Sequence, residues 1–373
     1  MLPAHSPLAR SLADVSAEHA ASLWDTVDRG GQPRHLLTFV VVDGLGADLI
    51  ADHSGHCPTL HRALVDSGDV VSSGLPSTTA AALASITTGV PAGTHGLLGY
   101  QLRDPRSHQL VNHLKPFPSG VTPATWQPVA THFETATQRG IGTLVVGERR
   151  FQGTDFSESI LRGGNFVSSH SLDDHLQAYR SFADSNEYGL GYLYWPTLDR
   201  IGHAKGVDSV AWRDALEQFE GFFRTLCSLI APGEHVVVLA DHGMVDVPAD
   251  QHWVMDSSHP VRSAISLWAG EPRCVHLYLH DPLEAEVIAT ELSTILQGVA
   301  TVLSRQECLE RGLFGPGTPA VFERVGDLVL FAGGHSALYD EQTATIQSRQ
   351  MIGQHGSWTA REMRVPAIIL SGR

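Results

Sequence analysis

The sequence predicts an α/β fold with a mostly parallel central sheet, helices on both faces and an inserted smaller α/β subdomain. Two apolar runs, residues 36–42 and 235–240, are typical of strands buried on both faces of a parallel sheet. Helical and strand patterns alternate around these runs, as βα units do. Closely spaced strands replace this pattern between residues 255 and 340. We therefore expect a core of residues 1–254 and 341–373 and an inserted cap subdomain of residues 255–340.

Each element follows from a local pattern. Apolar, β-branched stretches bounded by turn residues predict core strands, and amphipathic stretches predict the helices that cover them. The expected core strands are 36–42, 69–72, 142–146, 190–195, 235–240 and 367–370, with helices near 57–65, 80–88, 129–138 and 212–230. In the smaller unit we expect strands 264–268, 275–279, 299–303 and 328–331 and a helix over 283–295. The polar residues 101–127 and 150–169 predict surface segments, the second of them a loop at the rim.

Composition excludes several classes of partner. A formal net charge of -15 argues against a nucleic-acid polymer, whose binding depends on Lys and Arg. No apolar run is long enough to span a membrane, and polar residues including His5, Arg10 and Asp14 interrupt the first segment. We therefore expect a cytoplasmic protein without a membrane partner. The four cysteines form no CxxC pair, and nothing in the composition indicates an oligomeric state.

A hydroxyl-rich run begins the helix expected over residues 80–88. Pro76, Ser77, Thr78 and Thr79 precede five small or apolar helix formers, and Gly89 ends the stretch. The free N–H groups at a helix start favour an oxyanion or a bound phosphate, which is the setting that an alkoxide nucleophile needs. The alternative is that one of the threonines only caps the helix.

Carboxylates follow two of the expected strands. Asp43 ends the first strand, where ligands bind in open α/β sheets, although an Asp there also serves as a turn or cap residue. A dinucleotide-binding GxGxxG is excluded because Leu49 occupies its third glycine position. Asp199 and His203 are four residues apart, which places them on one face of a helical turn, as metal ligands often are.

A third strand end and a late histidine complete the candidate set. Asp241 and His242 follow an apolar strand directly, and two polar groups that are costly to bury there favour ligand roles. His355 lies in a Gly-Gln-His-Gly segment far from the other residues in sequence. In a chain of this charge, a small anion needs bound metal ions to reverse the local field.

Taken in order, these segments resemble the alkaline phosphatase superfamily, and most closely its type I phosphodiesterase/nucleotide pyrophosphatase branch. The resemblance covers residues 36–370 and includes Thr88-Gly89 and His95-Gly96. It implies an alkaline-phosphatase-like fold and two divalent ions, with Thr79, rather than Thr78, as the nucleophile between them. One ion would be held by Asp199, His203 and His355, and the other by Asp43, Asp241 and His242.

The resemblance implies a two-metal phosphoester hydrolase that forms a phosphothreonine. The expected activity is that of a phosphodiesterase or nucleotide pyrophosphatase on a small phosphate ester or nucleotide. Imidazole ligands favour Zn²⁺ over Mg²⁺ and leave Mn²⁺ open. Tyr100 stands where the family carries a phosphoryl-binding Asn, and Ala81-Ala82 where it carries Pro-Asn. We therefore expect Tyr100 to bind substrate. The alternatives are a phosphomonoesterase, another phosphate-transfer member of the superfamily, or a catalytically silent metal- or nucleotide-binding protein.

Overall fold

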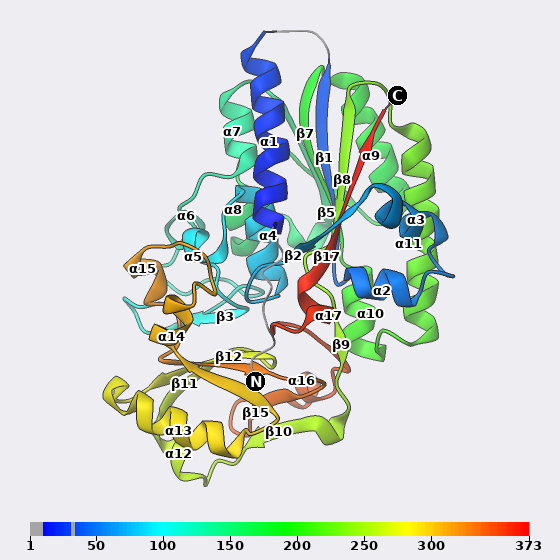
Figure 1. The fold of residues 1–373 in the computed structure, drawn as a ribbon. Coiled ribbons are helices and arrows are strands. Elements are labelled where there is room, and N and C mark those ends of the chain that lie inside the picture. Colours follow the sequence, from blue (N-terminus) through cyan, green and yellow to red (C-terminus); the bar gives the residue numbers. More distant parts are fainter. Residues whose placement is uncertain (1–9, 31–33, 373) are drawn as a thin grey trace.

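A seven-stranded sheet forms the centre of the computed structural model, which describes residues 10–30 and 34–372 (Figure 1). Its strand order is β2-β17-β8-β1-β7-β5-β6. All of its strands run parallel except β17, which is antiparallel to both of its neighbours. The strands are β1 (His35–Val42), β2 (Asp69–Ser72), β5 (Gly142–Glu148), β6 (Phe166–Ser169), β7 (Tyr188–Trp195), β8 (Glu234–Leu239) and β17 (Arg364–Ser371). The predicted α/β class with a mostly parallel sheet is confirmed.

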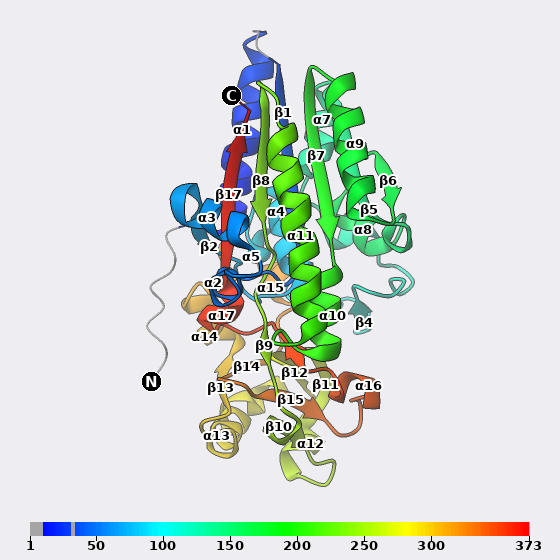
Figure 2. The same cartoon turned by 90° about the vertical axis from the view of Figure 1, so that its right-hand side faces the viewer.

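Helices cover both faces of this sheet (Figures 1 and 2). One face carries α1 (Leu12–Asp28), α4 (Thr79–Thr88) and α7 (His132–Gln138); the other carries α3 (Pro58–Ser67), α9 (Leu172–Ser185) and α11 (Val210–Leu229). Within the described residues, no helix combines the length and the apolar character needed to cross a membrane. Helix α1 begins after a Ser11 capping box and includes Asp14, whereas His5 lies outside the described residues.

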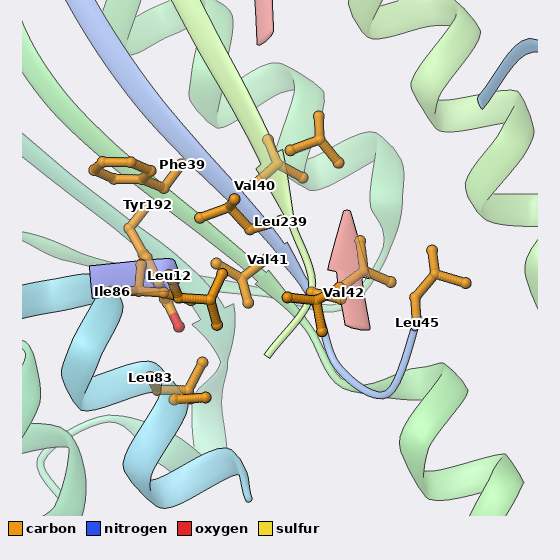
Figure 3. Close-up of a cluster of buried hydrophobic side chains, with 14 of the residues drawn as sticks. Leu12, Phe39, Val40, Val41, Val42, Leu45, Leu83, Ile86, Tyr192 and Leu239 are labelled. Carbon is orange, nitrogen blue, oxygen red and sulfur yellow. The ribbon is translucent and has the colours of Figure 1, made fainter. Parts of the chain in front are cut away.

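The main hydrophobic core lies between β1 and the helices in front of it (Figure 3). Seven of the eight residues of β1 are buried, because this strand has neighbours on both sides and helices on both faces. Phe39 lies beside Tyr192 of β7, its partner in the sheet, and both belong to one buried cluster with Val41, Leu12 of α1, and Leu83 and Ile86 of α4. The continuous apolar run predicted to be a doubly buried strand therefore is one.

A second, antiparallel sheet lies beyond the carboxyl ends of the central strands (Figure 1). It consists, in spatial order, of β11 (Ile265–Glu271), β12 (Cys274–Leu279), β14 (Leu328–Ala332) and β13 (Ala300–Ser304). Alternate residues of β14 face opposite sides: Leu328 and Leu330 pack in a separate cluster with α13 (Ala285–Ile295), whereas Val329 and Phe331 join the main core. The small sheet is therefore packed on both faces.

Shorter elements lie between these strands and helices along the chain. They are α2 (Ala47–Asp52), α5 (Ala92–His95), β3 (Gln101–Arg103), β4 (Leu110–Asn112), α6 (Pro123–Trp126), η1 (Arg149–Phe151), α8 (Asp155–Ile160), α10 (Thr197–Lys205), β9 (Val245–Asp246), η2 (Ala249–Gln251), β10 (His252–Met255), α12 (Pro260–Ala264), η3 (Pro282–Glu284), α14 (Arg305–Glu310), α15 (Pro319–Phe322), β15 (Ala337–Asp340), α16 (Ile346–Arg349), β16 (Gly353–Gln354) and α17 (Ala360–Met363). The small two-stranded pairs β3–β4, β9–β16 and β10–β15 complete the topology.

The prediction of a rim loop over residues 150–169 is wrong. Thr154 caps helix α8, and residues 166–169 form β6, the edge strand of the central sheet. An edge strand has one neighbour, and this one is partly exposed, so its residues lack the apolar run of a central strand. The segment 101–127 also contains regular structure, and its Trp126 is buried.

Candidate active site

Three carboxylates meet at the carboxyl edge of the central sheet. Asp43 follows β1, Asp241 lies just beyond β8, and Asp199 lies in α10, which follows β7. Since β1 pairs with both β7 and β8, the ends of these three strands are adjacent. Sequence reasoning placed these residues at strand ends, and the strand order brings the ends together.

The turn after β1 lies very close to helix α10 at this site. Gly44 has φ +77°, and a Cβ atom at this position would lie 3.2 Å from the Cα of Asp199. Its backbone N–H donates to Oδ1 of Asp241 at 3.0 Å. A glycine at position 44 therefore permits both the left-handed backbone and the contact between the β1 and β7 ends.

Three imidazoles face the carboxylates in the same tautomer. In His203, His242 and His355 the Nδ1 atom lies within hydrogen-bond distance of a main-chain carbonyl, which can only accept. The carbonyls belong to Gly353, Gly243 and Ser77, at 2.6, 2.9 and 3.0 Å. In the neutral ring Nε2 then carries no proton and is free to bind a cation, which is how metal-binding histidines are usually oriented.

The Nε2 atoms point at carboxylate oxygens. Nε2 of His203 lies 3.2 Å and Nε2 of His355 lies 3.6 Å from Oδ1 of Asp199. Nε2 of His242 lies 3.3 Å from Oδ1 of Asp43. The pKa of His355 is well below its ordinary value, first because of burial and then because His242 and His203 are near. A neutral His355 is the form that can ligate a metal.

One oxygen of each of the three carboxylates lacks a hydrogen-bond partner in the part of the chain that the structure describes. Among the described residues, Oδ1 of Asp43, Oδ1 of Asp199 and Oδ2 of Asp241 have no hydrogen-bond partner. Burial raises the pKa of Asp43 well above its ordinary value, and repulsion by Asp241 and Asp199 adds to this effect. The pKa of Asp241 is also raised, again chiefly by burial. Such a cluster is costly unless cations neutralise it.

The donors fall into two groups that fit divalent metal ions. Asp199, His203 and His355 form one group, and Asp43, Asp199 and His242 the other, with one ligand atom from each residue within 4.8 Å of the rest of its group. Nitrogen and oxygen donors of this kind suit Zn²⁺ and Mn²⁺. Asp199 is common to both groups, which sequence reasoning missed. Asp241 lies outside the second group, although its Oδ2 is 3.5 Å from Nε2 of His242, so its ligand role stays a prediction.

The hydroxyl of Thr79 lies beside this cluster. Helix α4 begins at Thr79, and the Oγ1 atom of this residue is 3.1 Å from Nε2 of His242. Thr78 occupies the N-cap position, but within the described chain its side chain makes no capping hydrogen bond. The helix start and the metal-ligand candidates therefore meet at Thr79, and capping does not explain either threonine.

Tyr100 makes its hydrogen bonds elsewhere. Its backbone N–H donates to Oε2 of Glu271 at 2.8 Å, and its hydroxyl accepts from Nδ2 of Asn112 at 3.2 Å. A substrate-binding role for Tyr100 stays a prediction.

Two further residues support the site and were missed from the sequence. The hydroxyl of Tyr194, near the end of β7, donates to Oδ2 of Asp43, which leaves Oδ1 free. Ser77 accepts from His355 and pairs with Gly356 through its backbone N–H at 3.2 Å. Ser77 lies in the hydroxyl-rich run, which by its sequence indicates only the start of a helix. Nothing in the sequence distinguishes Tyr194 from the other aromatic residues of its strand.

Comparison with known proteins identifies the family. The profile of the type I phosphodiesterase/nucleotide pyrophosphatase family matches residues 37–358. The chain belongs to this family. Both the family predicted from the motifs and the prediction of an enzyme are confirmed: family members are metal-dependent hydrolases of phosphoric esters or anhydrides. Among curated proteins, no sequence matches the chain significantly.

Solved structures share the fold of this phosphodiesterase-family chain. Murine ectonucleotide pyrophosphatase/phosphodiesterase 5 is 16% identical, with a TM-score of 0.72 and coverage of 91% of this chain and 88% of that one. An inactive variant of the murine protein in complex with AMP gives a TM-score of 0.71, at the same identity and coverage. Phosphonoacetate hydrolase from Sinorhizobium meliloti 1021, in complex with phosphonoacetate, is 21% identical, with a TM-score of 0.69 and coverage of 91% of both chains.

Proposed function

We propose that the protein is a two-metal phosphodiesterase or nucleotide pyrophosphatase with Thr79 as its nucleophile, acting on a small-molecule substrate. The observation that carries this proposal is the 3.1 Å approach of the Thr79 hydroxyl to His242, inside a cluster of unpartnered carboxylate oxygens. A silent binding protein would not need a hydroxyl at this point. The murine neighbour binds AMP and the bacterial one phosphonoacetate, which supports a small phosphorus-containing substrate.

Six residues would hold the two ions. Asp199, His203 and His355 would hold one, and Asp43, Asp241 and His242 the other, with Asp199 able to reach both groups. Divalent ions bound there would lower the pKa of the nucleophile and stabilise charge on the attacking and leaving oxygens. The side chains are already oriented for this task, because main-chain carbonyls fix the three imidazoles and Tyr194 fixes Asp43.

In the proposed reaction, Oγ1 of Thr79 forms a bond to phosphorus while the bond from phosphorus to the leaving oxygen breaks, and the leaving group takes up a proton. Water then cleaves the phosphothreonine and regenerates the hydroxyl. The first N–H groups of α4, a helix of 10 residues, favour the negative charge on the phosphoryl oxygens. Zn²⁺ and Mn²⁺ both suit the donor set.

We further propose that residues 255–340 act as a cap that shapes the substrate pocket. Support comes from the position of this segment in the chain, between the residue pair Asp241-His242 and His355, and from the small sheet beyond the carboxyl ends of the central strands (Figure 1). Trimming its outer loops should change the preference among substrates more than the rate on a small activated ester. Equal loss on all substrates would contradict a cap role.

The function is tested on chelator-treated protein that is reloaded with Zn²⁺ or Mn²⁺. Turnover is then measured on bis(p-nitrophenyl) phosphate, p-nitrophenyl phosphate, a nucleoside triphosphate and phosphonoacetate, and metal content by elemental analysis. We expect two ions per chain. The highest kcat/KM should be found on bis(p-nitrophenyl) phosphate or on the nucleoside triphosphate. Metal-free protein with full activity would refute the two-metal proposal, and preference for phosphonoacetate would assign another reaction of the superfamily.

A further inference from the structure

The loop that carries His355 lies against the small sheet. The Trp358 ring stacks on Phe331 of β14, with 4.3 Å between ring centroids and 10° between planes. Two residues after His355, Oγ of Ser357 donates to the carbonyl of Ala332 at 2.7 Å. The small sheet therefore contributes directly to the position of this loop.

The strongest of these contacts comes from the turn between β11 and β12. Arg273 and Glu362 form a fully buried ion pair, with both side chains 0% exposed. Nε and Nη2 of the guanidinium donate to the two carboxylate oxygens at 2.7 and 2.8 Å, the parallel geometry in which Arg binds carboxylates most strongly. This pair joins the small sheet to α17 of the core.

Glu362 in turn contacts both loops that carry metal-ligand candidates. Its Oε1 accepts from the backbone N–H of Ser357 at 3.0 Å, in the His355 loop. Its carbonyl accepts from the backbone N–H of Gly243 at 2.7 Å, directly after His242. A single residue, held by Arg273, thus connects two loops that are distant in sequence.

Glu271, two residues before Arg273, packs on the same loop. A Cβ atom at Gly356, next to His355, would lie only 2.6 Å from Cγ of Glu271, so the two residues are in close contact. Oε2 of Glu271 accepts from the backbone N–H of Tyr100 at 2.8 Å. The β11–β12 turn therefore contacts the His355 loop directly through Glu271, and indirectly through Arg273 and its partner Glu362.

We propose that the β11–β12 turn, residues 271–274, is a positioning element for the metal site, with Arg273 acting through Glu362 and Glu271 acting through Gly356. The proposal rests on the proposed metal-dependent function. Without Arg273, the Glu362 carboxylate would remain buried without its counter-charge, so it would either take up a proton or become solvated through a shift of the two loops, and both outcomes alter the contacts that it makes to them. A displaced His355 or His242 would bind a cation less well.

The test compares Arg273→Met with Arg262→Met. Arg262 offers a matched control, because it pairs with buried Asp340 through two hydrogen bonds of 2.8 and 3.1 Å and also donates to a main-chain carbonyl. This second pair joins α12 to β15 and contacts neither ligand loop. Zinc affinity is measured by competition with a chromophoric chelator, and ligand geometry by the visible absorption of Co²⁺-loaded protein.

We expect Arg273→Met to weaken zinc binding about 10- to 100-fold, the usual loss when a group supporting a metal ligand is removed, and to change the Co²⁺ spectrum. Arg273→Lys should recover part of the affinity, because it restores the charge without the two-pronged geometry. Arg262→Met should lower the Tm but leave zinc affinity and the spectrum as in the wild type.

Wild-type zinc affinity in the Arg273→Met protein, or an equal loss in Arg262→Met, would overturn the proposal. If Arg273→Met does not fold, Glu271→Ala decides, and an unchanged affinity and spectrum there would overturn it as well. Absence of zinc binding by the wild-type protein would instead refute the proposed metal-dependent function.

Discussion

Buried carboxylates at the two ends of the central sheet differ in their hydrogen-bond partners. At the amino end, Glu234 is 1% exposed and accepts hydrogen bonds from Tyr179 at 2.7 Å and from Arg180 at 2.9 Å, with Arg34 3.0 Å away. At the carboxyl end, three carboxylate oxygens have no hydrogen-bond partner among the described residues. At the amino end, away from the candidate site, arginines neutralise the buried acid. The unneutralised acids mark the end of the sheet where cations are expected.

The largest effect is expected from removing the hydroxyl of Thr79, at the carboxyl end of the sheet. Thr79→Ala should lower kcat by about 10³-fold or more, because no other group replaces a nucleophile, while metal content stays at the wild-type level. Thr78→Ala, which alters the neighbouring hydroxyl, is the control and should keep most of the activity. Steady-state kinetics on a diester and elemental analysis measure both quantities. An inactive Thr78→Ala with an active Thr79→Ala would place the nucleophile one residue earlier.

A substitution at the amino end of the sheet should change stability and leave activity unchanged. Glu234→Gln should lower the free energy of unfolding by about 2–4 kcal/mol, because it removes the counter-charge of two partly buried arginines. Urea unfolding measures the loss, and kcat/KM of the remaining folded protein should be unchanged. A fall in kcat/KM would show that the two ends are not independent.

Replacing Asp43 by its amide should change stability in the opposite direction. Its folded pKa is raised above the ordinary value of 3.8, so between these two values the folded state retains a proton that the unfolded state has released. Stability of the chelated protein should therefore fall as pH rises from about 4 through the raised pKa. Asp43→Asn should reduce this dependence, of which Asp241 with its raised pKa retains a part, and should stabilise the chelated protein by about 1 kcal/mol or more at neutral pH, while abolishing turnover. Urea unfolding in EDTA across this pH range measures it, and a less stable Asp43→Asn would contradict the expectation.

The smallest effect concerns the neutral hydroxyl of Tyr100. We expect kcat/KM to be higher on bis(p-nitrophenyl) phosphate than on p-nitrophenyl phosphate, and Tyr100→Phe to shift this ratio several-fold, since one neutral hydroxyl compensates a singly charged diester better than a dianion. The Tyr100 hydroxyl accepts a hydrogen bond from Asn112, so the same ratio should also be measured in Asn112→Ala. An unchanged ratio in Tyr100→Phe would remove the hydroxyl from substrate recognition, and a monoester preference in the wild type would refute the diester assignment.

Sequence reasoning succeeded where local chemistry decides the structure. Apolar runs identified β1 and β8 because these strands are buried on both faces, and polar residues directly after them identified the edge where the candidate site lies. It failed for β6, whose partly exposed residues carry little apolar pattern.

The supporting contacts of the site could not be predicted, for a different reason. The carbonyl partner of His355 belongs to Ser77, and that of His203 to Gly353, so each contact joins segments that only the tertiary fold brings together. The sharing of Asp199 between two ligand groups likewise depends on distances that sequence spacing does not contain. Residue types at the site were therefore accessible from the sequence, and their connections were not.

The late position of His355 has a consequence for synthesis on the ribosome. Chains emerge from their amino end, so Asp43, Asp199 and Asp241 leave the exit tunnel well before the last imidazole and before β17, the strand that lies between β2 and β8. During that interval the nascent chain holds the repelling acids without the loop that completes the site. Metal loading of the complete site should therefore follow emergence of the segment around residue 355, and ribosome-arrested chains that end before residue 353 should retain less zinc than chains in which all of residues 1–373 have emerged.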